Sequence, residues 1–173
     1  MLIQRRTSVD NDRFNRPFAD FVNGFSTTQG DFWFGLELLH KLTSAAKTRY
    51  QLVLGAKRRD NGRWMEVVLD NFYVDSGDGY HLRFGSIVAK RNTGISDWNV
   101  NYFRDKLFSA HDHDQDSSSS FDCASSRKGG WWFGYCSLIC LNCDQRTIAA
   151  EIWRESGNHV SLSETKMSIR IKM

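Results

Sequence analysis

Three aspartates, Asp112, Asp114 and Asp116, alternate with other residues just ahead of a run of four serines. Carboxylates this close together repel one another unless a hard cation that prefers oxygen ligands, such as Ca²⁺, binds among them. An EF-hand loop counted from Asp112 would need glycine at its sixth position and glutamate at its twelfth, where this chain has Ser117 and Cys123. The residues therefore leave two possibilities open, a calcium loop of another kind and a solvated acidic loop.

All four cysteines lie between positions 123 and 143. Such local clustering indicates a stapled or metal-bound loop region rather than scattered buried thiols, and four cysteines allow three pairings. The cellular compartment depends on what these cysteines do.

Composition predicts one folded domain, because 40% of the 173 residues are hydrophobic and 13% are aromatic. The net charge is only +3 and the basic residues are spread along the chain, which argues against a nucleic-acid partner. The densest basic stretch, residues 57–63, is typical of a solvated hairpin turn. No apolar run is long enough to cross a bilayer, and residues 1–11 lack the apolar core of a signal peptide.

Two amphipathic helices are expected in the first quarter of the chain. Apolar residues at helical spacing fall within 14–25, with Pro17 near the start and Gly24 near the end, and a second stripe falls within 35–43. His40 on the second helix is expected to be a half-buried core residue rather than a metal ligand.

Short runs rich in β-branched and aromatic residues follow, separated by turn signals, and predict an antiparallel meander. These runs are 50–54, 64–69, 72–74 and 80–84. Strict alternation of apolar residues in 166–173 predicts a last strand that rejoins the sheet. The stretch from about residue 91 is polar and rich in Gly, Ser and Asp, and loops of this length tend to be functional.

Several motifs occur together and in a specific order along the chain. They are IQRR at 3–6, GF at 24–25, GDFWFG at 30–35, HKLT at 40–43, LFSAHDHDQD at 107–116 and CASSRKGGWWFGYC at 123–136. This combination resembles the fibrinogen-related domain family, which includes fibrinogen chains, ficolins, tachylectins and angiopoietins, and the resemblance spans nearly the whole chain.

The resemblance implies an α+β fold of the fibrinogen C-terminal type, with a central twisted antiparallel sheet, short flanking helices and a loop-rich subdomain for calcium and ligand binding. We expect a single domain over 1–173. Residues of about 1–90 and 160–173 would form the helix and sheet core, and residues of about 91–159 the loop-rich region. The resemblance implies no catalytic arrangement and hence no enzyme.

By the same resemblance, Ca²⁺ would be held by the carboxylates of Asp114 and Asp116 and by the backbone carbonyls of Ser118 and Ser120. Asp112 would act as a nearby supporting charge. The alternative is a degenerate loop that binds nothing.

The resemblance also implies a disulfide between Cys123 and Cys136, and therefore an extracellular, secreted protein. Cys140 and Cys143 depart from the family, where Asn and Gly occupy these positions of an N-L-N-G motif. Four interpretations of Cys140 and Cys143 are open: an extra local disulfide, two free thiols, part of a four-cysteine zinc site, or a C-x-x-C redox motif.

The family binds ligands beside the peptide that precedes the second cysteine, a peptide that is often cis. The matching residues here are Arg127, Trp132, Tyr135, Cys136 and Ser137. Arg127 stands where the lectin branch has an aromatic residue, which favours anionic ligands if the side chain lines the pocket rather than pointing into solvent. The connection between Asn142 and Trp153 is shorter than in the family, where a longer loop helps to wall the pocket, so the resemblance implies a pocket that is shallower or differently built.

These expectations lead to a secreted, calcium-binding, lectin-like domain that recognises glycans or acetylated or acidic groups in innate immunity. The alternatives are an angiopoietin-like receptor-binding or extracellular-matrix module and a truncated paralogue that binds nothing. The family's N-terminal segment would precede Leu2, so the chain is expected to be a fragment or a truncated paralogue, with any oligomerisation through a segment absent here.

Overall fold

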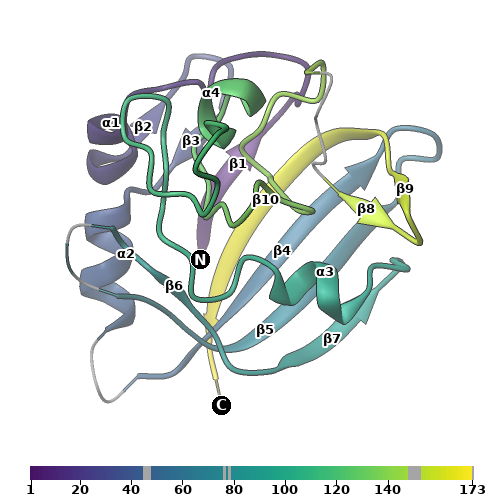
Figure 1. Ribbon diagram of the computed structural model, residues 1–173. Helices are drawn as coiled ribbons and strands as arrows, with labels where there is room; N and C mark the ends of the chain where they lie inside the picture. The colour runs from purple at the N-terminus through teal and green to yellow at the C-terminus, as the bar shows by residue number, and fades with distance from the viewer. Residues whose placement is uncertain (45–47, 76, 78, 148–152, 173) are drawn as a thin grey trace.

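A twisted antiparallel sheet forms the body of the molecule in the computed structural model, which describes residues 1–44, 48–75, 77, 79–147 and 153–172 (Figure 1). Within the described residues the sheet has eight strands in the order β2-β3-β1-β10-β4-β5-β6, and β7 also pairs with β5. The strands of this sheet are β1 (Leu2–Arg6), β2 (Phe25–Ser26), β3 (Phe32–Trp33), β4 (Tyr50–Arg58), β5 (Trp64–Val74), β6 (Leu82–Arg83), β7 (Ile87–Arg91) and β10 (Leu162–Ile171). A separate two-stranded hairpin consists of β8 (Arg154–Glu155) and β9 (Asn158–His159).

The last strand, β10, lies in the middle of the sheet between β1 and β4. It pairs antiparallel with both, so that Met167 on β10 lies opposite Gln4 on one side and Leu54 on the other. Its alternation places Met167 and Ile169 in the core. The predicted terminal strand therefore exists and begins at Leu162, earlier than expected, whereas Met173 lies outside the described residues.

In the described part of the chain, four short helices flank the sheet: α1 (Phe18–Asn23), α2 (Leu36–Thr43), α3 (Asp97–Asn101) and α4 (Cys123–Arg127). Figure 1 shows α1 and α2 at one side of the sheet, with the stretch that carries α3 and α4 crossing in front of it. α1 is shorter than the predicted 14–25. Pro17 precedes its first residue and disfavours helical backbone upstream, and Gly24, with φ 85°, ends it.

The predicted antiparallel meander is confirmed for the β4–β5 hairpin and for the pairing of residues 73–74 with Leu82–Arg83, but its division into four separate strands is wrong. The runs 64–69 and 72–74 form one strand, β5, because Asn71 adopts a left-handed φ of 51° without ending the pairing. β7 then pairs with the first half of β5 and β6 with its second half. The pair Asp70-Asn71, whose residue types are typical of a turn, thus forms an irregularity within a strand. Asparagine adopts the left-handed backbone conformation found here more readily than most residues do.

The hydrophobic core joins the sheet to the loop-rich stretch. Trp131, Trp132 and Phe133 are fully buried, although they belong to the stretch expected to be loops. The Trp132 ring packs 5.1 Å from Phe108 and 6.0 Å from Trp33, measured between ring centroids. Aromatic contacts of this kind stabilise a core beyond the area they bury, so the loop-rich stretch shares one core with the sheet.

A buried polar network fixes β1 to the loop that carries the second pair of cysteines. The Arg6 guanidinium is fully buried and donates to the carbonyls of Leu141, Cys143, Val9 and Asn11 at 2.5–3.4 Å. Burial lowers its pKa to about 10, so Arg6 remains charged at neutral pH. Gln4 donates to the Asn142 side chain at 3.0 Å.

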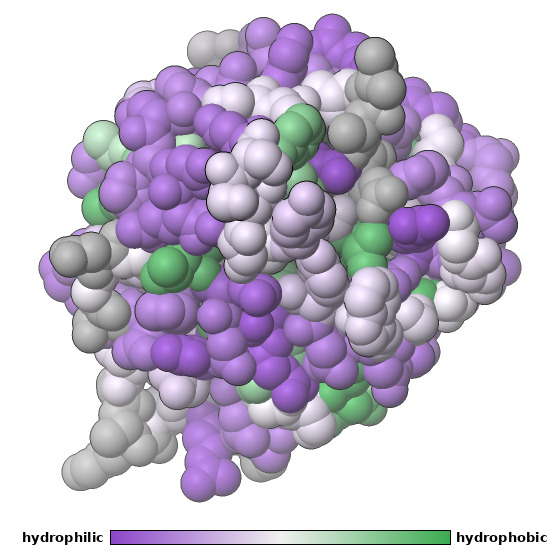
Figure 2. Space-filling model, in the orientation of Figure 1, coloured by the Kyte–Doolittle hydropathy of each residue, from purple (hydrophilic) through white to green (hydrophobic). Residues whose placement is uncertain are grey.

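The surface shown in Figure 2 is mostly hydrophilic, with small, separate hydrophobic patches. Within the described residues, no helix combines the length and the apolar character that a membrane crossing requires.

Candidate functional site

Three carboxylates converge in the loop that precedes α4. One ligand oxygen from each of Asp114, Asp116 and Asp122 lies within 4.8 Å of the other two. Asp114 is exposed, whereas Asp116 and Asp122 are half-buried. The structure thus brings together the two predicted aspartates and adds Asp122, which the alternating pattern did not include.

Hydrogen bonds to the backbone hold this acidic loop in place. Asp116 accepts from the amides of Ser118 at 2.7 Å and Cys123 at 2.9 Å, and Asp114 accepts from the Asp116 amide at 3.1 Å. Asp122 caps α4 by accepting from the Ser125 amide at 2.8 Å. Burial is the main cause that raises the pKa of Asp116, and the neighbouring Asp114 charge adds to it. The loop is therefore pre-shaped around concentrated negative charge.

The other residues predicted for the metal site, Ser118, Ser120 and Asp112, differ in burial and in their contacts. Ser118 is buried and Ser120 is exposed. Asp112, expected as a supporting charge, accepts from the Phe18 amide at 2.7 Å at the start of α1. Asp112 therefore anchors a helix N-terminus, where a carboxylate is favourable.

The four cysteines form two disulfides. Cys123 pairs with Cys136 across 13 positions, and Cys140 pairs with Cys143 across 3. All four are buried. This pairing contradicts the four-cysteine zinc site and the free thiols, and it confirms the extra local disulfide. The burial of Cys140 and Cys143 argues against a redox role for this C-x-x-C pair, because thiol exchange needs access to the sulfur atoms.

We expect the Cys123–Cys136 disulfide to stabilise the fold more than the Cys140–Cys143 disulfide. In the chain-entropy model the longer loop is worth about 3 kcal/mol and the shorter about 2 kcal/mol. Urea unfolding of a Cys123→Ala/Cys136→Ala variant and a Cys140→Ala/Cys143→Ala variant measures both losses. A larger loss from the second variant would contradict this order.

The residues predicted to contact ligand are mostly buried. Trp132 is fully buried and donates its indole N–H to the Tyr80 carbonyl at 2.8 Å. Cys136 and Ser137 are buried, and Arg127, the last residue of α4, is only 6% exposed. Arg127 therefore neither points into solvent nor presents an exposed guanidinium to an anion, since its helix packs on the core. Tyr135, at 69% exposure, is the member of this set that faces solvent.

The Tyr135–Cys136 peptide also differs from the expectation. The described residues contain no cis peptide bond, and the chain turns here through Cys136, which has a left-handed φ of 54°. The shortened connection between Asn142 and Trp153, predicted to alter the pocket wall, includes residues 148–152, which lie outside the described residues.

A groove of about 410 Å³ lies beside the acidic loop, and we name it the α3 groove. It is lined by Trp98, Asn101, Tyr102, Arg104, Lys106, Ser117 and Tyr135. Ser117 directly follows Asp116, so the groove and the acidic loop adjoin. Sequence reasoning missed these residues apart from Tyr135, although residues 98–106 combine two aromatic residues that lie four positions apart with two nearby cations.

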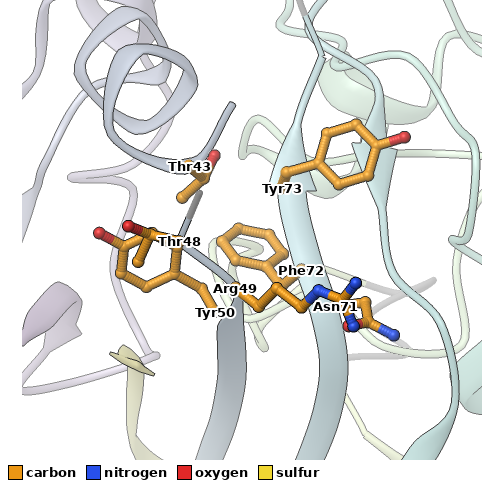
Figure 3. Close-up of a pocket in the computed structure, with 7 residues that line it drawn as sticks. All are labelled: Thr43, Thr48, Arg49, Tyr50, Asn71, Phe72 and Tyr73. Carbon is orange, nitrogen blue, oxygen red and sulfur yellow. The ribbon is translucent and has the colours of Figure 1, made fainter. Parts of the chain in front are cut away.

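A second hollow, of about 330 Å³, lies where the end of α2 meets β4 and β5. It is lined by Thr43, Thr48, Arg49, Tyr50, Asn71, Phe72 and Tyr73. Figure 3 shows the Arg49 side chain extending toward Asn71 on β5. This second hollow does not share residues with the acidic loop.

Comparison with known proteins identifies the domain. A model of the C-terminal globular domain of fibrinogen beta and gamma chains matches residues 1–172. Protein scabrous of Drosophila melanogaster is 36% identical over 149 residues, which cover 81% of this chain and 16% of that protein. Techylectin-5A of Tachypleus tridentatus is 29% identical over 179 residues, which cover 98% of this chain and 58% of that protein. The chain thus spans less than two thirds of either relative.

A solved structure gives the same result. The fibrinogen-like globe domain of human ANGPTL6 superposes with a TM-score of 0.81 at 28% identity, over 98% of this chain and 76% of that chain. This similarity confirms the expected α+β fibrinogen-type fold. Because the family model matches all but one residue, the chain belongs to the family of the fibrinogen C-terminal globular domain.

Proposed function

We propose that this chain is a secreted recognition domain that binds Ca²⁺ in its acidic loop and recognises glycans as a lectin does. Members of the family are binding modules rather than enzymes. The observation that carries the proposal is the adjacency of the three-carboxylate cluster and the α3 groove, which meet at Ser117. The two disulfides support an oxidising, extracellular compartment.

The donor set fits Ca²⁺. Asp114, Asp116 and Asp122 offer only oxygen atoms, which calcium prefers, and they would hold the ion. The buried Ser118 hydroxyl has no hydrogen-bond partner among the described residues. It adds one more oxygen atom to the surroundings of the three carboxylates. A bound Ca²⁺ supplies positive charge that offsets the repulsion between these carboxylates.

Calcium is expected to stabilise the fold, because a ligand bound only by the folded state does so by mass action. Extracellular calcium modules bind with Kd values of about 0.1–1 mM. About 10 mM Ca²⁺ should then add roughly 1.4–2.7 kcal/mol and raise the Tm by roughly 3–10 °C. Differential scanning calorimetry with Ca²⁺, Mg²⁺ and chelator measures this shift.

The matched variants are Asp114→Asn with Asp116→Asn, which should remove the shift, and Asp60→Asn, an exposed hairpin aspartate that should keep it. If the double variant responds to calcium as the parent does, the ion does not bind in this loop.

Recognition itself is tested on an array of glycans and acetylated compounds, with and without Ca²⁺, beside a screen for binding to cell-surface proteins. Glycan binding that needs calcium supports the lectin-like function. Receptor or matrix binding, the second candidate, is favoured by the similarity to the ANGPTL6 globe. Binding in the receptor screen alone would replace the first candidate by the second, and binding in neither assay would reject both.

A further inference from the structure

We infer that the α3 groove binds one anionic pyranose, a sugar residue that carries a sulfate or a carboxylate. This inference rests on the proposed glycan recognition and names its ligand class and its contacts. It moves the preference for anions from Arg127, which is buried, to Arg104 and Lys106 in the groove.

Exposed aromatic rings supply a flat apolar surface. Trp98 is 66% exposed and Tyr135 is 69% exposed, although large aromatic side chains usually bury most of their area. Trp98 projects outward because the opposite face of α3 carries the buried Val100, and Ser96 caps the helix by accepting from the Asn99 amide at 3.1 Å. Rings with an apolar body suit the C–H face of a pyranose.

The aromatic surface is continuous rather than a single ring. The ring centroids of Trp98 and Tyr102 are 5.3 Å apart. The Tyr102 hydroxyl donates to the Tyr135 carbonyl at 3.1 Å, which joins the two sides of the groove. A sugar that stacks on one of these rings therefore contacts an aromatic surface whose geometry is fixed before the sugar binds.

Arg104 and Lys106 give the groove its positive charge. Within the described part of the chain, neither makes an ion pair with a carboxylate, whereas the nearby Asp105 pairs with Arg83 at 2.9 Å and Asp97 with Lys90 at 2.6 Å. Arg104 donates to the Gly85 carbonyl and lies 4.5 Å from the centre of the Phe84 ring, which fixes its position. Because the Arg104 guanidinium is engaged in these contacts, Lys106 is the cation that can meet a ligand, and its charge beside exposed rings favours an anionic sugar over a neutral one.

Because Gly134 has no side chain, Lys106 and the Tyr102 ring can pack closely against the backbone at this position. A Cβ at Gly134 would lie 3.1 Å from the Lys106 Cε and 3.3 Å from the Tyr102 Cε1. The Gly134 carbonyl accepts from the Ser117 amide at 3.0 Å. The groove is thus pre-organised, which reduces the entropy lost on binding, and its volume of about 410 Å³ lies in the range of small-ligand sites.

The acidic loop affects this site through charge. Asp116 directly precedes Ser117 of the groove wall, so uncompensated carboxylates in the loop repel an anion in the groove. Calcium bound in the loop would reduce this repulsion. The inference therefore expects anionic sugars to need calcium more than neutral sugars do.

The experiment uses three matched sugars, N-acetyllactosamine, its 6-sulfated form and its sialylated form, measured by titration calorimetry in calcium with the parent and four variants. The two charged sugars separate sulfate from carboxylate recognition. The parent should bind one or both of the charged forms more tightly than the neutral one, and added salt should weaken that binding.

Lys106→Gln should weaken the charged sugars roughly tenfold and leave the neutral sugar unchanged, since a charged hydrogen bond is worth about 1.5 kcal/mol or more. Trp98→Ala should weaken all three. The matched controls are Lys41→Gln, an exposed lysine on α2, and Tyr73→Ala, an exposed aromatic on β5, and both should bind as the parent does.

The two failures are distinguishable. If the parent binds all three sugars with one affinity, or if Lys106→Gln ranks them as the parent does, the groove assignment is overturned while glycan recognition stands. If the parent binds none of the sugars and nothing on the wider glycan array, the proposed recognition function fails as well.

Discussion

Replacing Gly129 by alanine is expected to destabilise the domain by about 3 kcal/mol or more, because the added methyl group has no space. A Cβ there would lie 2.2 Å from the backbone oxygen of Asn142 and 3.0 Å from the Cα of Cys143. These are backbone atoms, and the Cys140–Cys143 disulfide and the hydrogen bonds from Arg6 restrain their movement. The cost is therefore steric and falls on a segment that cannot shift easily.

Urea unfolding of three alanine variants tests this steric argument. At Gly130 the Cβ would meet the rings of Phe21 and Phe108 at 2.6–2.8 Å, and because side chains yield more readily than backbone we expect a smaller loss. Gly94 is the control, since its nearest neighbouring atom is the Glu155 Oε2 at 3.9 Å. The expected order of destabilisation is Gly129, Gly130, Gly94, and a Gly129→Ala variant as stable as Gly94→Ala would contradict the packing described for this loop.

Arg6→Met is expected to cost about 3 kcal/mol, or roughly 6–12 °C in Tm. Methionine keeps much of the volume but removes every donor that Arg6 directs at the carbonyls of Leu141, Cys143, Val9 and Asn11. A buried carbonyl left without a donor costs about 1–3 kcal/mol. Thermal unfolding of the variant by circular dichroism measures the loss.

Two variants show whether the loss comes from these hydrogen bonds. Arg5→Met changes the neighbouring, exposed arginine on β1 and should leave the Tm nearly unchanged. Arg6→Lys keeps the charge but lacks the planar set of donors, and its Tm should fall between the parent and Arg6→Met. An Arg6→Lys variant with the stability of the parent would mean that charge alone, rather than donor geometry, fixes this loop.

The long elements were predictable because their sequence carries a period. α2 occupies Leu36–Thr43 against the predicted 35–43, and β10 follows a strict alternation. β2 and β3 have two residues each, too few to show any period. Their position depends on the pairing of Trp33 with Gln4, which local sequence does not encode.

The candidate site was predictable only where its residues adjoin in sequence. Asp114 and Asp116 follow from their spacing, whereas Asp122 joins them because the chain turns back to begin α4. The α3 groove draws on three segments, whose approach is fixed by the Tyr102–Tyr135 and Ser117–Gly134 hydrogen bonds. Arg127 was misplaced because a charged residue in a polar stretch indicates exposure, while the packing of α4 against the core buries it.

The central position of β10 restricts when during its synthesis the domain can fold. β1 and β4 both pair with β10, so neither strand gains that partner until residues 162–171 have left the ribosome. Until then the edges of β1 and β4 that pair with β10 are unpaired, and unpaired strand edges favour aggregation. The β4, β5, β6 and β7 strands can pair with one another before that point, but β1 joins them only once β10 has been made.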